Sequence, residues 1–380
     1  MSERIGRLLL DGELVPGRVR FEGGRLTAVE RLPEVAPGTP LLAPGLVDLH
    51  LHGYAGCDPL VDLPGLARAL ASVGTTAFLP TLFPTDPARL GLEAESVWKQ
   101  RNELGPGAAR VLGIHLEGPF VNPERAGALP RDRLVAPSPA ALRALLGPSS
   151  AEGRGIRQVT LAPELPGSAD LVRELACSGV RVSLGHSAAS AAEAAAAAEL
   201  GARGATHLFN AMGGLHHRAP TLASFALAED ALVAEIIGDL VHVGREAFRI
   251  ALRARGPQGL ALVSDALLGA GTRTTEFESH GRRCRVHGGA IWLVDDDPNV
   301  PPRLTGAEAC QMEAVRRLVR AGAAGPAAAL TMAAETPARA LGLERELGRL
   351  VPGARADLVV LDPQGLELLE VLVGGEPVPQ

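Results

Sequence analysis

The sequence predicts an α/β protein in which a (β/α)8 TIM barrel carries a small β-sandwich domain formed by the N- and C-terminal segments. Three observations predict this fold. Eight short apolar runs alternate with alanine- and leucine-rich stretches in the middle of the chain, and both ends show β-type patterns. In addition, 46% of the 380 residues are hydrophobic, which is enough for a large buried core.

The small domain is expected from residues 1–44 together with residues 346–380. The segment VRFEGGRLTAVE alternates apolar and polar residues around a Gly-Gly pair, which predicts a hairpin. The C-terminal segment LGRLVPGARADLVVLD has the same character. Two β-rich ends around a different middle indicate one sheet domain built from both termini.

The barrel is expected from residues 45–345. Its eight strands are predicted at 45–52, 75–81, 110–118, 156–164, 179–187, 204–210, 233–239 and 259–266. Strands that alternate with helices predict right-handed βαβ units and a parallel sheet, and eight such units predict a closed barrel. No GxGxxG opens a helix after the first strand, which disfavours a dinucleotide-binding fold. The segment 267–303 fits no helix and is expected to be a long loop or hairpin, followed by helices at about 306–322 and 326–342.

Charge and cysteine content leave small-molecule chemistry open and suit a protein of the cytoplasm. The formal net charge is −6 and the charges are interspersed, which disfavours nucleic-acid and membrane-surface partners. No apolar stretch is long enough to span a bilayer, and the N-terminus turns polar too soon for a signal peptide. The cysteines form no CxxC pair or disulfide framework, which suits a reducing compartment. Lys99 is the only lysine, so a Walker-type phosphate loop is excluded.

Candidate metal ligands lie at the C-terminal ends of the predicted strands, which form the active-site face of such a barrel. They are His50, His52, Glu117, His186 and His207. The first two are two residues apart on a strand, so their side chains face the same side. A single histidine at such a place is more often a hydrogen-bonded core residue. Five ligand-type residues at one face instead predict a site for Zn²⁺, Fe²⁺ or a similar divalent ion.

Asp265 ends the eighth predicted strand, in VSDA, and is the candidate general acid and base. At the metal-binding rim its carboxylate can accept a proton from water and return it to a leaving amine. The alternative is a helix N-cap, because Ser and Asp commonly cap the helix after a strand. The neighbouring ligand cluster favours the catalytic role.

Several motifs, in order and spacing, resemble the N-acetylglucosamine-6-phosphate deacetylases of the amidohydrolase superfamily, over nearly the whole chain. They are PGLVDLHLHG (44–53), HLEGPFVNPERAGA (115–128), LAPE (161–164), GHSAA (185–189), THLFNAM (206–212), HHR (216–218), GDLVHV (238–243), SDA (264–266) and LTG (304–306). HLEGPF and THLFNAM are far more diagnostic than the HxH pair.

The resemblance implies a metal-dependent hydrolase that converts N-acetylglucosamine 6-phosphate to glucosamine 6-phosphate and acetate in amino-sugar catabolism. It implies one or two divalent ions per chain, with zinc the first candidate and iron, cobalt or manganese as alternatives. The main ion would be held by Glu117, His186 and His207, and a second ion, present in only some members, by His50 and His52. Lys99 is unsuitably placed for a bridging carboxylated lysine, which leaves the glutamate as the bridge.

The resemblance also implies a set of sugar-phosphate contacts. These would come from Ala128, Asn210, Ala211, Arg218, His242, Leu304, Thr305 and Gly306. In this family the arginine at the position of Arg218 reaches the neighbouring subunit's site, which implies a homodimer.

Two residues depart from the family pattern. Leu129 stands where the family has a histidine that is thought to help hold and polarise the acetyl carbonyl. Before His242, the usual aspartate-glycine pair is Asp239-Leu240, so Leu240 stands in place of the glycine. Either change could alter substrate preference. Two alternatives therefore stay open: an amidohydrolase for a different N-acyl amino sugar, and a weakened paralogue that binds a sugar phosphate.

Overall fold

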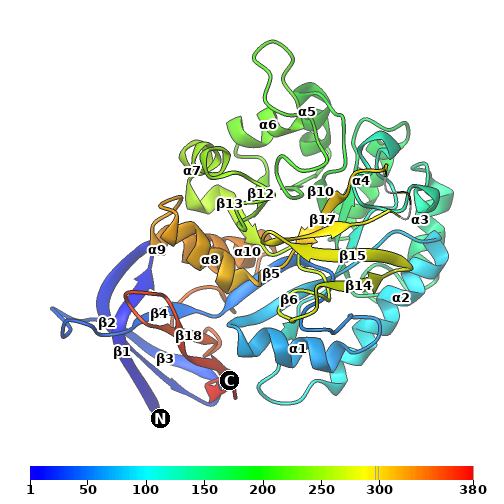
Figure 1. Ribbon diagram of the computed structural model, residues 1–380. Helices are drawn as coiled ribbons and strands as arrows, with labels where there is room; N and C mark the ends of the chain where they lie inside the picture. Colours follow the sequence, from blue (N-terminus) through cyan, green and yellow to red (C-terminus); the bar gives the residue numbers. More distant parts are fainter. Residues whose placement is uncertain (296, 298, 380) are drawn as a thin grey trace.

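The computed structural model describes residues 1–295, 297 and 299–379 and shows a parallel barrel beside a smaller antiparallel sheet (Figure 1). The barrel strands are β5 (Leu46–Leu51), β6 (Thr75–Leu82), β7 (Arg110–Val111), β8 (Ile114–Glu117), β9 (Ile156–Leu161), β10 (Arg181–Leu184), β11 (Gly204–Ala205), β12 (Val233–Ile237) and β13 (Leu260–Val263). The sheet runs from β5 through β6, β8, β9, β10, β11 and β12 to β13, and β7 pairs with β6. Each predicted strand is present, so the predicted barrel is confirmed.

Helices follow the strands in alternation and cover the outside of the barrel. They are α1 (Leu63–Ser72), α2 (Pro87–Gln100), α3 (Pro139–Leu146), α4 (Ser168–Cys177), α5 (Ala191–Glu199), α6 (Leu222–Ala228), α7 (Arg245–Gly259), α8 (Gln311–Arg320), α9 (Pro326–Ala333) and α10 (Glu335–Ala340), with 3₁₀ turns at Arg101–Glu103, Pro123–Arg125 and Arg131–Arg133. Polar caps set several helix starts, since the Asp62, Asp86 and Ser138 side chains accept backbone N–H groups of α1, α2 and α3. The helix predicted at 326–342 is divided at Ala334, whose φ of −125° is not helical.

The first and last barrel strands meet at a seam that two main-chain hydrogen bonds and one side chain close. The main-chain N–H of Asp265 donates to the His50 carbonyl at 2.8 Å, and that of His52 donates to the Ala266 carbonyl at 2.8 Å. Deeper in the barrel, the buried Gln311 amide donates to the carbonyls of Val47 and Leu262, at 2.8 and 2.7 Å. One side chain therefore joins β5 to β13 where the two strands do not pair directly.

The smaller sheet is built from both ends of the chain, as expected. Its strands run in the order β20 (Glu376–Pro377), β19 (Leu368–Val373), β18 (Leu358–Leu361), β4 (Leu41–Pro44), β1 (Ser2–Leu10), β2 (Glu13–Glu22) and β3 (Arg25–Arg31). The predicted hairpin is β2–β3, and Gly23 and Gly24 occupy its turn with φ of 57° and 78°. Glycine adopts these positive φ values without steric cost. The domain boundaries themselves stay a prediction.

The segment predicted as a long loop or hairpin forms a four-stranded antiparallel meander. Its strands are β14 (Glu276–Ser279), β15 (Arg282–His287), β16 (Ala290–Leu293) and β17 (Arg303–Ala307). Two of its arginines hold the loop that follows β8: Arg282 donates to the Ala128 carbonyl, and Arg303 to the Gly127 carbonyl at 3.3 Å. The meander is therefore attached to a loop of the barrel's C-terminal face.

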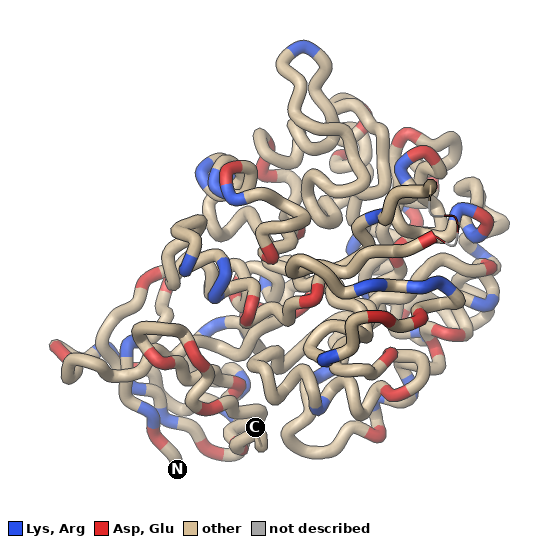
Figure 2. The backbone as a smooth tube through the Cα atoms, viewed as in Figure 1, with Lys and Arg blue, Asp and Glu red and all other residues tan. Residues whose placement is uncertain are grey.

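Charged residues of both signs are interspersed along the chain rather than gathered in one region (Figure 2). Among the described residues, no helix combines the length and the apolar character that a membrane crossing requires.

Candidate active site

A cavity of about 210 Å³ opens at the C-terminal ends of the barrel strands. Its lining gathers residues from seven strand ends and from β17: His52, Phe83, Glu117, Gly127, Ala128, Leu129, His186, His207, Asn210, Ala211, His242, Asp265, Leu304 and Thr305. His50 lies directly beneath it and is fully buried. The five predicted metal ligands and Asp265 are thus brought together.

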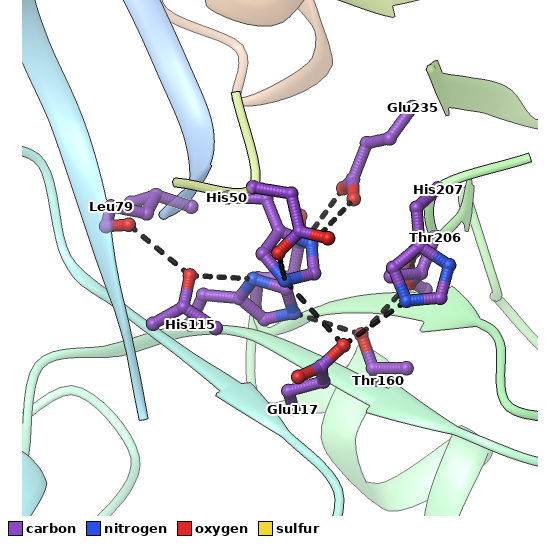
Figure 3. A network of polar contacts seen from close by, with 12 residues as sticks. His50, Leu79, His115, Glu117, Thr160, Thr206, His207 and Glu235 are labelled. Carbon is purple, nitrogen blue, oxygen red and sulfur yellow. Dashed lines mark hydrogen bonds and ion pairs between the residues drawn. The ribbon is translucent and has the colours of Figure 1, made fainter. Parts of the chain in front are cut away.

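The Glu117 carboxylate is the centre of the histidine cluster (Figure 3). Its Oε1 lies 2.9 Å from the Nε2 atom of His186 and 3.1 Å from that of His207. Its Oε2 lies 3.2 Å from the Nε2 atom of His52, and Nε2 of His50 is 3.5 Å from Oε1. The structure therefore contains two groups of three converging ligand atoms that share one glutamate.

These spacings fit a divalent metal ion. The Nε2 atoms of His186 and His207 face each other at 3.0 Å. Ligands bonded to zinc at about 2.1 Å in a tetrahedron lie roughly 3.4 Å apart, close to the separations here. Two imidazoles and a carboxylate are also a donor set that zinc and iron accept.

The electrostatics of the cluster favour a cation. Burial opposes protonation of His50, but the carboxylates of Asp265 and Glu117 outweigh it and raise the pKa of His50 to about 10. The same carboxylates would stabilise a metal ion, which competes with the proton for imidazole nitrogen. The described part of the chain thus supports a divalent metal site.

Sharp turns at the strand ends aim the site residues into the cavity. His186, His207 and Asp265 all have positive φ, at 47°, 31° and 52°. Such backbone costs of order 1–3 kcal/mol per non-glycine residue and persists where the surrounding structure imposes it. Of the ten described non-glycine residues with positive φ, four line the cavity, namely these three and Ala211, which marks it as a candidate functional site.

Asp265 faces the histidines and does not cap a helix. Its Oδ1 lies 3.5 Å from Nε2 of His50 and 3.8 Å from Nε2 of His52. The next helix, α8, begins at Gln311 after Cys310. The side chain is 10% exposed, on the cavity side, where it can reach a bound molecule.

Most of the expected sugar-phosphate residues also line the cavity, and two do not. Ala128, Asn210, Ala211, His242, Leu304 and Thr305 line it; Gly306 follows the last of these but is absent from the lining. The His242 ring is held by Asp239, whose Oδ2 lies 2.6 Å from its Nδ1. Burial opposes the change, but this hydrogen bond raises the pKa of His242. Arg218 lies in the exposed segment 214–220, in the loop before α6, and is absent from the cavity lining.

The two departures from the family pattern occupy different surroundings. Leu129 lines the cavity, is 4% exposed and packs with Val121 and Ala126. Leu240 is absent from the lining and has φ of 64°, a conformation that suits the usual glycine. The leucine at position 240 therefore affects the local backbone conformation, whereas the side chain at position 129 can contact a substrate.

Two residues of the site were not predicted from the sequence. Phe83 follows β6, lines the cavity and stacks on His52 with ring centroids 3.8 Å apart. Glu235 on β12 is fully buried and approaches Nδ1 of His50 at 3.4 Å. A carboxylate inside the apolar run VAEIIGD was the available signal, because an unpaired buried charge is costly.

Comparison with known proteins agrees with this geometry. The family model described as "Amidohydrolase family" matches residues 41–378. The chain belongs to the amidohydrolase family. Among sequence relatives of this amidohydrolase, N-acetylgalactosamine-6-phosphate deacetylase of Escherichia coli O157:H7 is 33% identical, with 98% of each chain covered. N-acetylglucosamine-6-phosphate deacetylase of Homo sapiens is 36% identical, over 98% of this chain and 94% of the relative.

The chain is also similar to solved structures of N-acetylglucosamine-6-phosphate deacetylases. A mutant of N-acetyl-D-glucosamine-6-phosphate deacetylase from Mycobacterium smegmatis, in complex with N-acetyl-D-glucosamine 6-phosphate, superposes with a TM-score of 0.87. It is 29% identical and the match covers 100% of this chain and 99% of that one. The deacetylase from Thermotoga maritima also has a TM-score of 0.87, at 27% identity, with both chains covered in full. The amidohydrolase thus shares its whole fold with sugar-phosphate deacetylases.

Proposed function

We propose that this amidohydrolase removes the acetyl group from N-acetylglucosamine 6-phosphate, giving glucosamine 6-phosphate and acetate. The observation that carries the proposal is the convergence of Asp265 with the His50, His52, Glu117, His186 and His207 cluster in one cavity. The near-full-length relatives act, by their names, on N-acetylhexosamine 6-phosphates. We further propose zinc as the metal and the cytoplasm as the location.

The proposed chemistry assigns proton transfer to Asp265. A divalent ion held by the cluster would supply Lewis acidity at the amide carbonyl and lower the pKa of the attacking water. Asp265 accepts the proton that water loses as its oxygen bonds to the carbonyl carbon. It then donates that proton to the amide nitrogen as the C–N bond breaks, which releases the free amine and acetic acid, and the acid ionises to acetate by giving up the second proton of the water. The carboxylate returns to its ionised form.

Steady-state kinetics of the purified protein test the proposal. N-acetylglucosamine 6-phosphate should be hydrolysed with a kcat/KM well above those of its unphosphorylated form and of other N-acyl sugars. Absence of acetate release from all phosphorylated N-acyl sugars would contradict it.

N-acetylgalactosamine 6-phosphate is a second candidate substrate. The relative from Escherichia coli that is named for it matches 98% of both chains. The two sugars differ only in the configuration of one hydroxyl group, which is not part of the acetamide, so the same metal cluster and Asp265 can serve either. Assaying both epimers side by side decides which is preferred.

We propose that Arg218 binds the phosphate in the cavity of a second copy of the chain. The residue is exposed in its own subunit, and a guanidinium paired with His242 is a suitable phosphate grip. The proposal implies a homodimer.

Arg218→Ala is therefore expected to raise KM for the phosphorylated sugar by roughly 10- to 150-fold, the loss of a charge-assisted hydrogen bond worth about 1.5–3 kcal/mol. The unphosphorylated sugar should be almost unaffected. Arg273→Ala, also at an exposed position, is the control and should change neither KM. Equal effects of Arg218→Ala on both sugars, or a monomeric protein in solution, would contradict the cross-subunit assignment.

Leu129→His is expected to raise kcat/KM for the acetylated substrate, by at most about 10²–10³-fold, since an imidazole can donate a hydrogen bond to the carbonyl and leucine cannot. His216 and His217 do not replace this donor within the subunit, because both are exposed and absent from the cavity lining. The comparison variant is Leu129→Asn, which is polar but shorter. Unchanged or slower kinetics for Leu129→His would show that residue 129 does not face the carbonyl.

A further inference from the structure

Glu235 is a buried carboxylate beneath the active-site cavity. It lies in the middle of β12, is fully inaccessible to solvent and is absent from the cavity lining. Figure 3 shows its carboxylate pointing toward the imidazole of His50 from the side opposite Glu117. In the proposed reaction, Glu235 is neither a metal ligand nor a proton-transfer group.

Two buried donors fix the orientation of this carboxylate. Its Oε1 accepts from Gln158 Nε2 at 2.7 Å and from Arg181 Nη1 at 3.3 Å. Arg181 is itself held by the Val233 carbonyl at 3.1 Å and by the Gln158 side-chain oxygen. Oε1 is therefore occupied, and Oε2 is the atom left to face His50.

The contact with Glu235 decides which nitrogen of His50 carries the proton in the neutral ring. Oε2 lies 3.4 Å from Nδ1 of His50, and an ionised carboxylate can only accept. Nδ1 must therefore be the N–H donor, which leaves the lone pair on Nε2. That Nε2 is buried and has no hydrogen-bond partner within the described ranges, although it lies 3.5 Å from both Glu117 and Asp265.

His186 shows the same arrangement with a weaker acceptor. Its Nδ1 lies 2.9 Å from the Arg125 carbonyl oxygen, and its Nε2 faces Glu117. An acceptor on the outer nitrogen fixes the tautomer, and a carboxylate also makes the ring a stronger base. The Nε2 atom of His50 should therefore be a stronger electron donor to a metal than that of His186, whose Nδ1 faces only a main-chain carbonyl.

We propose that Glu235 is a positioning residue that holds His50 as the Nδ1–H tautomer and so presents its Nε2 to a metal ion shared with His52 and Glu117. The proposal rests on the metal site of the proposed function. It deepens that function, because it identifies a residue that orients a ligand of the second group, which consists of His50, His52 and Glu117. Glu235 touches neither that ion nor the substrate.

Glu235→Gln tests the proposal, with metal binding as the readout. A glutamine keeps the shape, but its amide N–H₂ can face Nδ1 and turn His50 into the Nε2–H tautomer, which cannot bind metal. Metal-free protein is titrated with Zn²⁺ against a chromophoric chelator. The wild type should bind two ions, and the variant should keep one affinity and lose about 10- to 100-fold in the other.

Two further variants separate positioning from general damage to the buried pair. Arg181→Gln disturbs the same pair but leaves the carboxylate at His50, so both affinities should be kept. The double variant Glu235→Gln/Arg181→Gln removes both charges, leaves neither unpaired, and should again lose only one site. Thermal unfolding of each metal-free protein reports whether it is folded.

The outcomes are distinct from those that test deacetylation. Two unchanged affinities in folded Glu235→Gln would overturn the proposal, as would equal loss of the second site in Arg181→Gln. A wild-type protein that binds a single ion would also overturn it. Failure to release acetate, with the metal results as expected, would count against the proposed function alone.

Discussion

Asp265→Asn is expected to lower kcat by about 10³–10⁴-fold while the fold and the bound metal are kept. General acid–base groups are worth roughly 10²–10⁴-fold, and one carboxylate that serves both proton transfers belongs near the upper end. Asparagine has the same shape and retains the main-chain hydrogen bond to His50, so loss of the ionisable oxygen is the intended change. Steady-state kinetics and elemental analysis of the same preparation measure the two quantities.

The matched control for this variant is Asp62→Asn, the same chemical change at the N-cap of α1, away from the cavity. It should leave kcat unaltered. A near-normal kcat in Asp265→Asn would remove the aspartate from the proton-transfer role. Loss of metal from that variant would instead make Asp265 a ligand.

Glu117→Gln is expected to lower both bound metal and activity, with a loss in kcat/KM on the order of 10⁴-fold or more, because a divalent ion held there would supply Lewis acidity at the carbonyl and lower the pKa of the attacking water. The reason is geometric: Glu117 is the one residue common to both groups of ligand atoms. Chelation of the wild-type protein should abolish activity to a similar extent. Elemental analysis and acetate release check both.

Restored activity on adding Zn²⁺ to the chelated wild type, but not to Glu117→Gln, is the internal control for this experiment. Full activity in rigorously metal-free protein would refute a metal-dependent reaction.

The barrel could be predicted because its strands are short, apolar and separated by helices. Strands β5 and β6 are buried along their whole length, and most of their residues are apolar, apart from Asp48 and His50 in β5 and three threonines in β6. The meander could not be predicted as a sheet, because it lies against the barrel with one face open. β15, for example, carries exposed arginines in RRCRVH and buries only Cys284 fully. The sequence of such a strand cannot be distinguished from that of a polar loop.

The candidate site was predictable to the extent that its residues end strands. His52, Glu117 and Asp265 were placed by the rule that the C-terminal ends of barrel strands meet at one face. Glu235 escaped because it lies within a strand, where the partners of a buried charge come from elsewhere in the chain. Arg181, for instance, is 54 residues away along the sequence. Pairings at that distance depend on register, which apolar patterns leave open.

The seam between β5 and β13 brings together site residues from the first and the last barrel strands in the chain. Asp265 and His50 are neighbours only because the last strand docks beside the first, across hydrogen bonds that involve Asp265, Ala266 and Gln311. During synthesis the histidine-bearing strand emerges early, and Asp265, the proposed acid–base residue, emerges late. The nascent polypeptide thus lacks the complete candidate site until its final barrel strand has been translated and Gln311 has followed it.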